Sequence, residues 1–274
     1  MIIISFSFKK SDEEIEAKNK RFESAEFYDA EMVAVFWLTK QEIIENLLPP
    51  PLKTVKHPLV TAFVSKYPKT NFGLAYDESA LFIRCQYEGE QGNYCLAMHL
   101  DGPGCDLGMA GGREIFGFPK KIAKIYFKKE GKNFEGWSER HAVKNIYLNV
   151  NFTGKPNAKE ALTILAEAGV FSTEVKPQIS YNFKFFGNPE GIGFDYDPKL
   201  VKQETLFRPK EIKIGEAELK LGSSVHDPWA ELEIVKLLGA AYTKGHNTML
   251  RGTVVAEVDS IKFMPYGFLK WDWF

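Results

Sequence analysis

The chain has 274 residues, of which 45% are hydrophobic and 26% charged, and its formal net charge is −1. These values are typical of a globular protein with its own core, and the balanced charge excludes the basic class of nucleic-acid binders. No apolar run reaches the roughly 18 residues of a membrane span, and the first residues lack a signal peptide's basic segment. With only three cysteines and no CxxC spacing, we expect a cytoplasmic protein with reduced thiols.

The first predicted element is a peripheral arm or helix within residues 1–28, because the stretch 9–24 is charged and has no strong apolar stripe. We expect residues 29–274 to form one domain that starts with a buried strand near 32–38. The sequence Thr39-Lys40-Gln41-Glu42 has the pattern of a capping box, which predicts a short helix over 40–48. Strands are then expected near 59–65, 72–76, 80–88, 93–101, 121–129, 134–140, 145–153, 178–186, 199–207, 211–221 and 250–263.

Two further helices are predicted in the second half of the chain. One covers residues 158–168 and ends at Gly169, and the other begins at Asp227-Pro228 and runs to about 238. The aromatic C-terminal stretch 263–274 is expected to pack on the domain or on a neighbouring subunit. Many short strands with glycine turns indicate an α+β, β-rich single domain, built as a barrel or sandwich with a few short helices.

Several patterns of common binding sites are missing from the sequence. The five histidines show no metal-ligand spacing such as HxH or HExxH, so no metal site is predicted. The glycine-rich segments 108–112 and 191–193 lack the residues of a phosphate-binding loop or a dinucleotide fold. No GxSxG motif marks a nucleophilic serine.

The adjacent lysines Lys120 and Lys121 lie in the apolar segment 115–123, where burial of two ammonium groups is costly. A free lysine titrates near 10.4, but desolvation and a neighbouring positive charge lower its pKa. The resulting neutral amine can attack a ketone and form a Schiff base. The alternative is a strand edge on which two lysines lay their stems along apolar surface and keep their charges in water.

The segment 112–121, GREIFGFPKK, resembles the signature of the acetoacetate decarboxylase family, in which a glycine-arginine-glutamate precedes aromatic-proline-lysine-lysine. Residues 93–101 and 73–79 are similar to two other segments of that family, and weaker similarity extends over about 30–260. The resemblance implies an antiparallel, cone-like β-barrel with a few peripheral helices. It also implies a homo-oligomer.

The resemblance assigns roles to residues of this chain. Lys120 would be the Schiff-base nucleophile, and Lys121 would lower its pKa or help to position it. Glu78 would be an acidic catalytic residue facing the pocket, and Met98 would form an apolar, substrate-binding wall. Arg113 and Glu114 would form a buried structural pair that supports the lysine strand.

Three positions depart from the family pattern in the predicted substrate pocket. Phe63 stands where the family has a glutamate, Ala30 where it has an arginine, and His226 where it has a second methionine. We include Phe63 and His226 among the substrate-binding candidates. Loss of the family glutamate and arginine changes how a substrate carboxylate would be held.

The implied reaction is decarboxylation of a small β-keto acid through an iminium on Lys120, without a metal or organic cofactor. One alternative keeps the iminium and uses it for aldol or dehydration chemistry on a keto acid. Another is a non-catalytic ligand-binding protein of the same fold. Neither nucleic acid nor a membrane is an expected partner.

Overall fold

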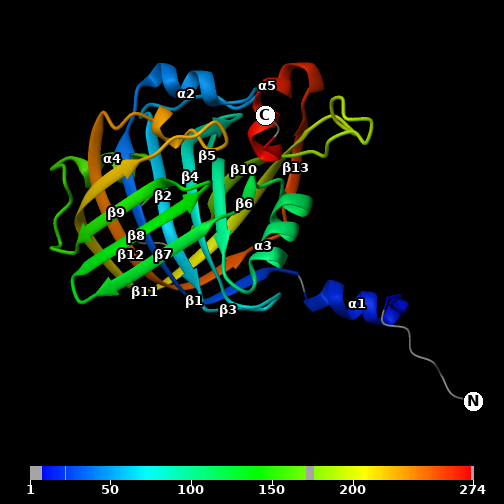
Figure 1. Cartoon of the computed structure of the whole chain (residues 1–274), viewed down its shortest axis with the longest axis horizontal. Helices are drawn as coiled ribbons and strands as arrows, with labels where there is room; N and C mark the ends of the chain where they lie inside the picture. Colours follow the sequence, from blue (N-terminus) through cyan, green and yellow to red (C-terminus); the bar gives the residue numbers. More distant parts are fainter. Residues whose placement is uncertain (1–7, 22, 171–175, 273–274) are drawn as a thin grey trace, which may run out of the picture.

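The computed structural model describes residues 8–21, 23–170 and 176–272, so the predictions for 1–7 and 273–274 lie outside the described residues. The described chain forms one β-rich α+β domain around a thirteen-stranded sheet (Figure 1). Its strands are β1 (Ala25–Leu38), β2 (Leu59–Tyr67), β3 (Lys69–Thr70), β4 (Tyr76–Tyr87), β5 (Glu90–Asp101), β6 (Lys120–Ile122), β7 (Lys124–Glu130), β8 (Asn133–Arg140), β9 (Val143–Asn151), β10 (Gln178–Lys184), β11 (Lys199–Leu221), β12 (Lys236–Met249) and β13 (Thr253–Glu257).

The main sheet runs in the order β10-β5-β4-β2-β1-β12-β11-β9-β8-β7. Strand β11 is 23 residues long, so it pairs with β10 through its first part and with β9 through its last part. The β10–β11 pairing returns the sheet on itself. Most pairs are antiparallel, as expected, but β5 runs parallel to both β6 and β10. The cone-like barrel stays a prediction.

The helices are few and lie around the sheet (Figure 1). Helix α1 projects away from the sheet, which agrees with the predicted peripheral helix, while β1 already begins at Ala25, before the expected boundary at residue 29. No helix in the described ranges is both long and apolar enough to cross a membrane. The helices are α1 (Asp12–Arg21), α2 (Gln41–Leu47), α3 (Cys105–Gly111), α4 (Ala161–Glu167) and α5 (Ser260–Trp271), with a π-helix η1 (Gly112–Phe116) and a 3₁₀ turn η2 (Trp229–Glu231).

The prediction of a helix from Asp227 to about 238 is wrong. Only the turn η2 follows Pro228, and strand β12 begins at Lys236. The Asp227 carboxylate does not cap a helix, because Lys121 and Arg140 bind it. The expected capping box is also absent, since α2 starts after Lys40 without a side-chain cap.

Two strand predictions are wrong as well. Residues 72–75 form a bend before β4, and the expected strand 250–263 ends at Glu257. Helix α5 follows, and the Asp259 carboxylate caps it by accepting a hydrogen bond from the backbone N–H of Lys262, at 2.9 Å. The aromatic stretch is thus helical, and its Phe263 is buried in the core, which confirms that it packs on the domain.

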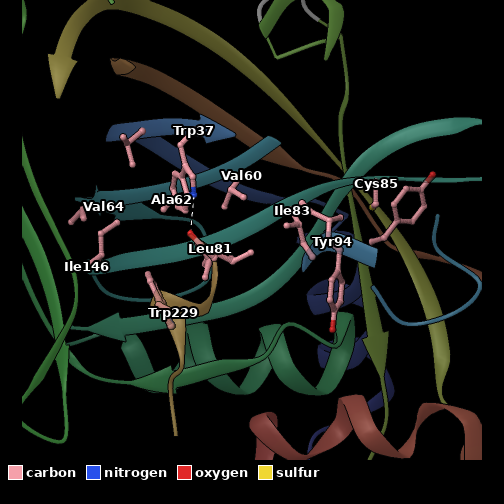
Figure 2. Packing of buried hydrophobic residues seen from close by; sticks show 14 of the residues in the cluster. Trp37, Val60, Ala62, Val64, Leu81, Ile83, Cys85, Tyr94, Ile146 and Trp229 are labelled. Atoms are coloured by element: carbon pink, nitrogen blue, oxygen red, sulfur yellow. Dashed lines mark hydrogen bonds between the residues drawn. The ribbon is translucent and has the colours of Figure 1, made fainter. Parts of the chain in front are cut away.

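The central strands are buried on both faces. One face carries the largest cluster, in which Trp37, Val60 and Leu81 pack toward Ile146 and Trp229 (Figure 2). The other face carries a second cluster, which contains Phe63, Tyr67, Tyr76, Met98 and Phe118. Because neighbouring residues of a strand point to opposite faces, this arrangement separates adjacent side chains into two environments.

Candidate active site

The strand of the two lysines is positioned by the turn that precedes it. After η1, Gly117 has a φ of +83°, and a Cβ there would lie 2.6 Å from the backbone of Phe183. Only glycine fits this conformation and this close approach. Phe118 and Pro119 then lead into β6, whose three residues pair in parallel with β5, with Lys120 beside Met98 and Lys121 beside His99.

The Lys120 side chain lies on the face of the second cluster, and its amine meets one acid. Its Nζ lies 2.8 Å from Oε2 of Glu78, and both side chains are less than 10% exposed. The hydroxyl of Tyr67 donates to the other oxygen of Glu78 at 3.3 Å. Burial and the charge of Glu78 raise the pKa of Tyr67 and of Tyr76 well above that of a free phenol, so both hydroxyls stay protonated.

Apolar and aromatic groups surround this pair. The rings of Phe118 and Tyr76 have their centroids 5.7 and 5.8 Å from the amine. Phe63 and Met98, the two apolar candidates for substrate binding, belong to the same buried cluster. A Cβ on Gly112 would lie only 2.5 Å from Cε of Lys120, so this glycine leaves room for the lysine stem. The structure therefore brings Lys120, Glu78, Met98 and Phe63 together.

Lys121 points to the opposite face, where its amine is surrounded by acceptors. Its Nζ donates to the backbone oxygen of His226 at 2.6 Å and lies 3.0 Å from Asp227 and 2.7 Å from Asp272. Two carboxylates thus neutralise this ammonium. Of the two roles implied for Lys121, the geometry favours positioning of the strand over a direct effect on the Lys120 amine.

The acids beside Lys121 belong to a wider buried network. Asp227 also binds Arg140 at 2.9 Å and accepts from Nε2 of His99 at 3.3 Å, while Arg140 binds Asp272 as well. Burial acts to raise the pKa of Asp227, but the hydrogen bonds and charges of His99 and Lys121 hold it well below its usual range. Burial and the charges of Lys121 and Arg140 lower the pKa of His99, although Asp227 opposes this effect.

Arg113 supports the lysine strand in a different way from the one predicted. Its Nη1 donates to the backbone oxygen of Lys120 at 2.9 Å and to that of Lys270 at 3.1 Å. Glu114 is exposed, so the expected buried Arg113–Glu114 pair is wrong. The guanidinium satisfies two backbone carbonyls instead, and it links β6 to helix α5.

His226, a candidate for substrate binding, is placed on the Lys121 side. Its ring lies 4.6 Å from that of His141, and its Nδ1 is 3.7 Å from Asp272. Ligand atoms of these three residues lie within 4.8 Å of one another, a spacing that could hold a metal ion. Because Lys121 and Arg140 already bind the Asp272 carboxylate, the cluster is accounted for as an ion-pair network.

A match between the chain and a family model decides the family. The model for acetoacetate decarboxylase matches residues 10–258. The chain belongs to the acetoacetate decarboxylase family. This confirms the resemblance seen in the segment 112–121, and it places Lys120 and Glu78 within the matched region.

Relatives with different names are similar to this chain. Acetoacetate decarboxylase 3 of Mesorhizobium japonicum is 37% identical over 233 residues, which cover 84% of each chain. A CLA biosynthesis isomerase of Lactiplantibacillus plantarum is 28% identical over 265 residues, 94% of this chain and 92% of the relative. This chain is therefore similar to proteins named for different reactions.

Solved structures agree on the fold. A crystal structure of acetoacetate decarboxylase from Legionella pneumophila superposes with a TM-score of 0.71 and 24% identity, covering 85% of this chain and 88% of that chain. The enduracididine biosynthesis enzyme MppR superposes with a TM-score of 0.64 and 16% identity, covering 85% of this chain and 88% of that chain. At these identities the likeness establishes a shared fold.

Proposed function

We propose that this protein is a Schiff-base-forming lyase that decarboxylates a β-keto acid through an iminium on Lys120. The observation that carries the proposal is the buried pair of Lys120 and Glu78, whose amine and carboxylate are 2.8 Å apart inside an aromatic and apolar cluster. Lys120 lies in the family segment 112–121, and the Glu78 carboxylate is near enough to accept the proton that the amine must lose.

The reaction follows from these groups. Glu78 accepts a proton from Lys120, and the neutral amine adds to the substrate ketone to give a carbinolamine. Glu78 returns the proton to the departing hydroxyl, water leaves, and an iminium forms. The bond to the carboxylate then breaks, CO₂ departs, and its electron pair moves to the iminium nitrogen as an enamine. Protonation of the enamine carbon and addition of water release the ketone and regenerate the amine.

The cluster around Lys120 suits the bond-breaking step. A carboxylate placed among the rings of Phe63 and Phe118 loses its hydration, while the transition state disperses its charge toward the iminium. The apolar residue Phe63 adds no second acid to this environment. The surroundings of Lys120 therefore favour departure of the charged carboxylate as neutral CO₂.

Borohydride trapping tests the proposal. Each member of a panel of β-keto acids is incubated with the protein and sodium borohydride, and peptide mass spectrometry locates the reduced adduct while CO₂ release is measured in parallel. We expect an adduct on Lys120 and none on Lys121, and we expect Lys120→Arg to lose both adduct and CO₂. Release of CO₂ without modification of Lys120 would refute the mechanism.

A second candidate reaction is isomerisation, favoured by the similarity to the CLA biosynthesis isomerase over nearly the whole of both chains. The same iminium acidifies a neighbouring C–H, so Glu78 can remove a proton from one carbon and return it to another, which moves a double bond without loss of carbon. The position of the double bond in an unsaturated ketone distinguishes the two reactions, because exchange of protons for deuterium beside the iminium accompanies both. Isomerisation predicts a shifted double bond in the product, and Glu78→Gln should abolish this shift.

A further inference from the structure

Helix α5 carries another buried lysine, Lys270, whose amine has no role in the proposed reaction. The residue is 6% exposed. Its Nζ donates to the backbone oxygen of Phe185 at 3.3 Å and lies 4.1 Å from the centroid of that ring. Among the described residues, no carboxylate lies within ion-pair distance of this amine. Buried lysines are normally paired with an acid, but no described residue supplies the counter-ion that the charged form of Lys270 requires.

Lys270 lines a cavity together with aromatic residues of β10 and α5. Cys95, Gly117 and Pro119 line it as well, and Pro119 directly precedes Lys120 in the sequence. Cys95 also belongs to the buried cluster around Lys120. Nη1 of Arg113 donates to the backbone oxygens of both lysines, so one guanidinium nitrogen links the two residues.

The charged groups around Lys270 are positive. Burial, together with the charges of Arg113 and Lys184, lowers the pKa of Lys270 to about 7. Burial also raises the pKa of Tyr94 and of Cys95, so these two cavity residues stay uncharged.

The remaining titratable groups near Lys270 in the described part of the chain supply no counter-ion. The Tyr266 phenol lines the cavity as well, and Asp272, two residues after Lys270, is bound by Lys121 and Arg140. The cavity thus combines apolar walls with a cationic end, which is the environment of a site for an organic anion.

We propose that Lys270 is a substrate-binding residue whose ammonium holds a carboxylate that the substrate retains. This inference rests on the proposed iminium at Lys120. A carboxylate that leaves as CO₂ must lie beside the iminium, and an ion pair there would stabilise the ground state more than the charge-dispersed transition state. Lys270 faces a separate cavity. Its ligand is therefore a second carboxylate, and the substrates are oxo acids that carry a carboxylate remote from the reacting carbonyl.

The test compares charged and uncharged ketones in the same trapping reaction. Methyl-ketone acids of increasing spacer length, and methyl ketones of matched length without the carboxylate, are titrated against the whole protein with borohydride. We compare the concentrations that give half of the maximal adduct on Lys120. Where the spacer is long enough to reach from Lys120 to Lys270, this concentration should be about 10- to 100-fold lower for the acid than for the ketone of matched length. Lys270→Met removes this difference, and Lys270→Arg retains it.

A pH series adds a readout that a purely structural role would not change. The ratio of ketone to acid half-saturation cancels any titration at Lys120. In the wild type this ratio should be constant below pH 7. Above pH 7 the ratio should fall by up to about tenfold per pH unit, because the anion binds the protonated amine of Lys270 and the protonated fraction decreases. In Lys270→Arg it should stay constant.

The outcomes separate the two proposals. Trapping of Lys270→Met by the uncharged ketone shows that this variant is folded. Equal half-saturation by acid and ketone at every spacer, with Lys120 still trapped, overturns the role of Lys270 and leaves the proposed function standing. Absence of an adduct with every probe overturns both.

Discussion

Lys120 and Lys121 are neighbours on β6, yet they lie in different environments on opposite faces of the sheet. The Lys120 amine meets one carboxylate, that of Glu78, among aromatic rings, whereas Lys121 meets two carboxylates and a backbone oxygen. A lysine with all its donors occupied cannot take up a further partner without breaking an ion pair. Neighbours in the sequence can thus differ in the number of their partners, and this difference is why we propose Lys120, and not Lys121, as the reactive amine.

The largest effects are expected from removing the Lys120–Glu78 pair and, in a separate variant, the Lys121 amine. The double variant Lys120→Met/Glu78→Gln removes the proposed nucleophile and both charges of the buried pair, so we expect loss of turnover by at least about three orders of magnitude. Its free energy of unfolding should be unchanged or higher, since replacing a buried ion pair by uncharged groups is often neutral or stabilising. Lys121→Met should instead cost about 3 kcal/mol, because it leaves Asp227 and Asp272 to share Arg140.

Urea unfolding and borohydride trapping measure these two effects separately. Below its unfolding transition, Lys121→Met should still form the adduct on Lys120. Unfolding of the double variant would contradict the proposed difference between the two faces. So would a folded Lys121→Met variant that forms no adduct on Lys120.

The fold class could be predicted because its signals are local. Alternating apolar residues and glycine turns indicated most strands, and the charged stretch 9–24 indicated the helix α1. The sequence signal failed at Asp227-Pro228, where a helix cap and an ion-pair partner look alike. It also failed at α5, whose aromatic residues resemble a strand until Asp259 caps the helix.

For the site, the motif identified Lys120, and the resemblance added Glu78, Met98 and Phe63, which the structure gathers around it. The partners of Lys121 were missed because Asp227 and Asp272 lie more than a hundred residues away in the sequence. No local pattern indicates such pairs. Tyr67 and Lys270 were missed for the same reason, since only the folded sheet brings them near the segment 112–121.

A smaller effect is expected from Gly112, which tests how closely the Lys120 face is packed. In Gly112→Ala the new Cβ would lie 2.5 Å from Cε of Lys120, so the flexible lysine stem must move while the backbone stays. Displacement of a reacting group by about 1 Å can cost about 100-fold in rate, so we expect a 10- to 100-fold slower reaction at about unchanged stability. Gly111→Ala is the matched control, because a Cβ there meets open space. Equal rates for the two variants would contradict this packing.

The smallest effect concerns pH and arises on the Lys121 face. His99 is fully buried, and burial together with the charges of Lys121 and Arg140 lowers its pKa below that of an unfolded histidine, about 6.5. Below that pH the unfolded chain takes up a proton that the folded protein does not. The stability linked to His99 is therefore complete above about pH 6.5 and is lost as the pH falls toward the lower folded value, by up to about 1.4 kcal/mol per unit.

His99→Gln isolates this contribution, because groups common to both proteins cancel in the difference between their urea-unfolding curves. We expect the wild type to lose stability faster than the variant between pH 6.5 and 5, with the same slope in both proteins above pH 7. Asp227 acts in a lower window, since its depressed pKa removes stability only below about pH 4. Parallel curves between pH 6.5 and 5 would mean that His99 takes up its proton in the folded protein, and that the Lys121 face tolerates a further positive charge.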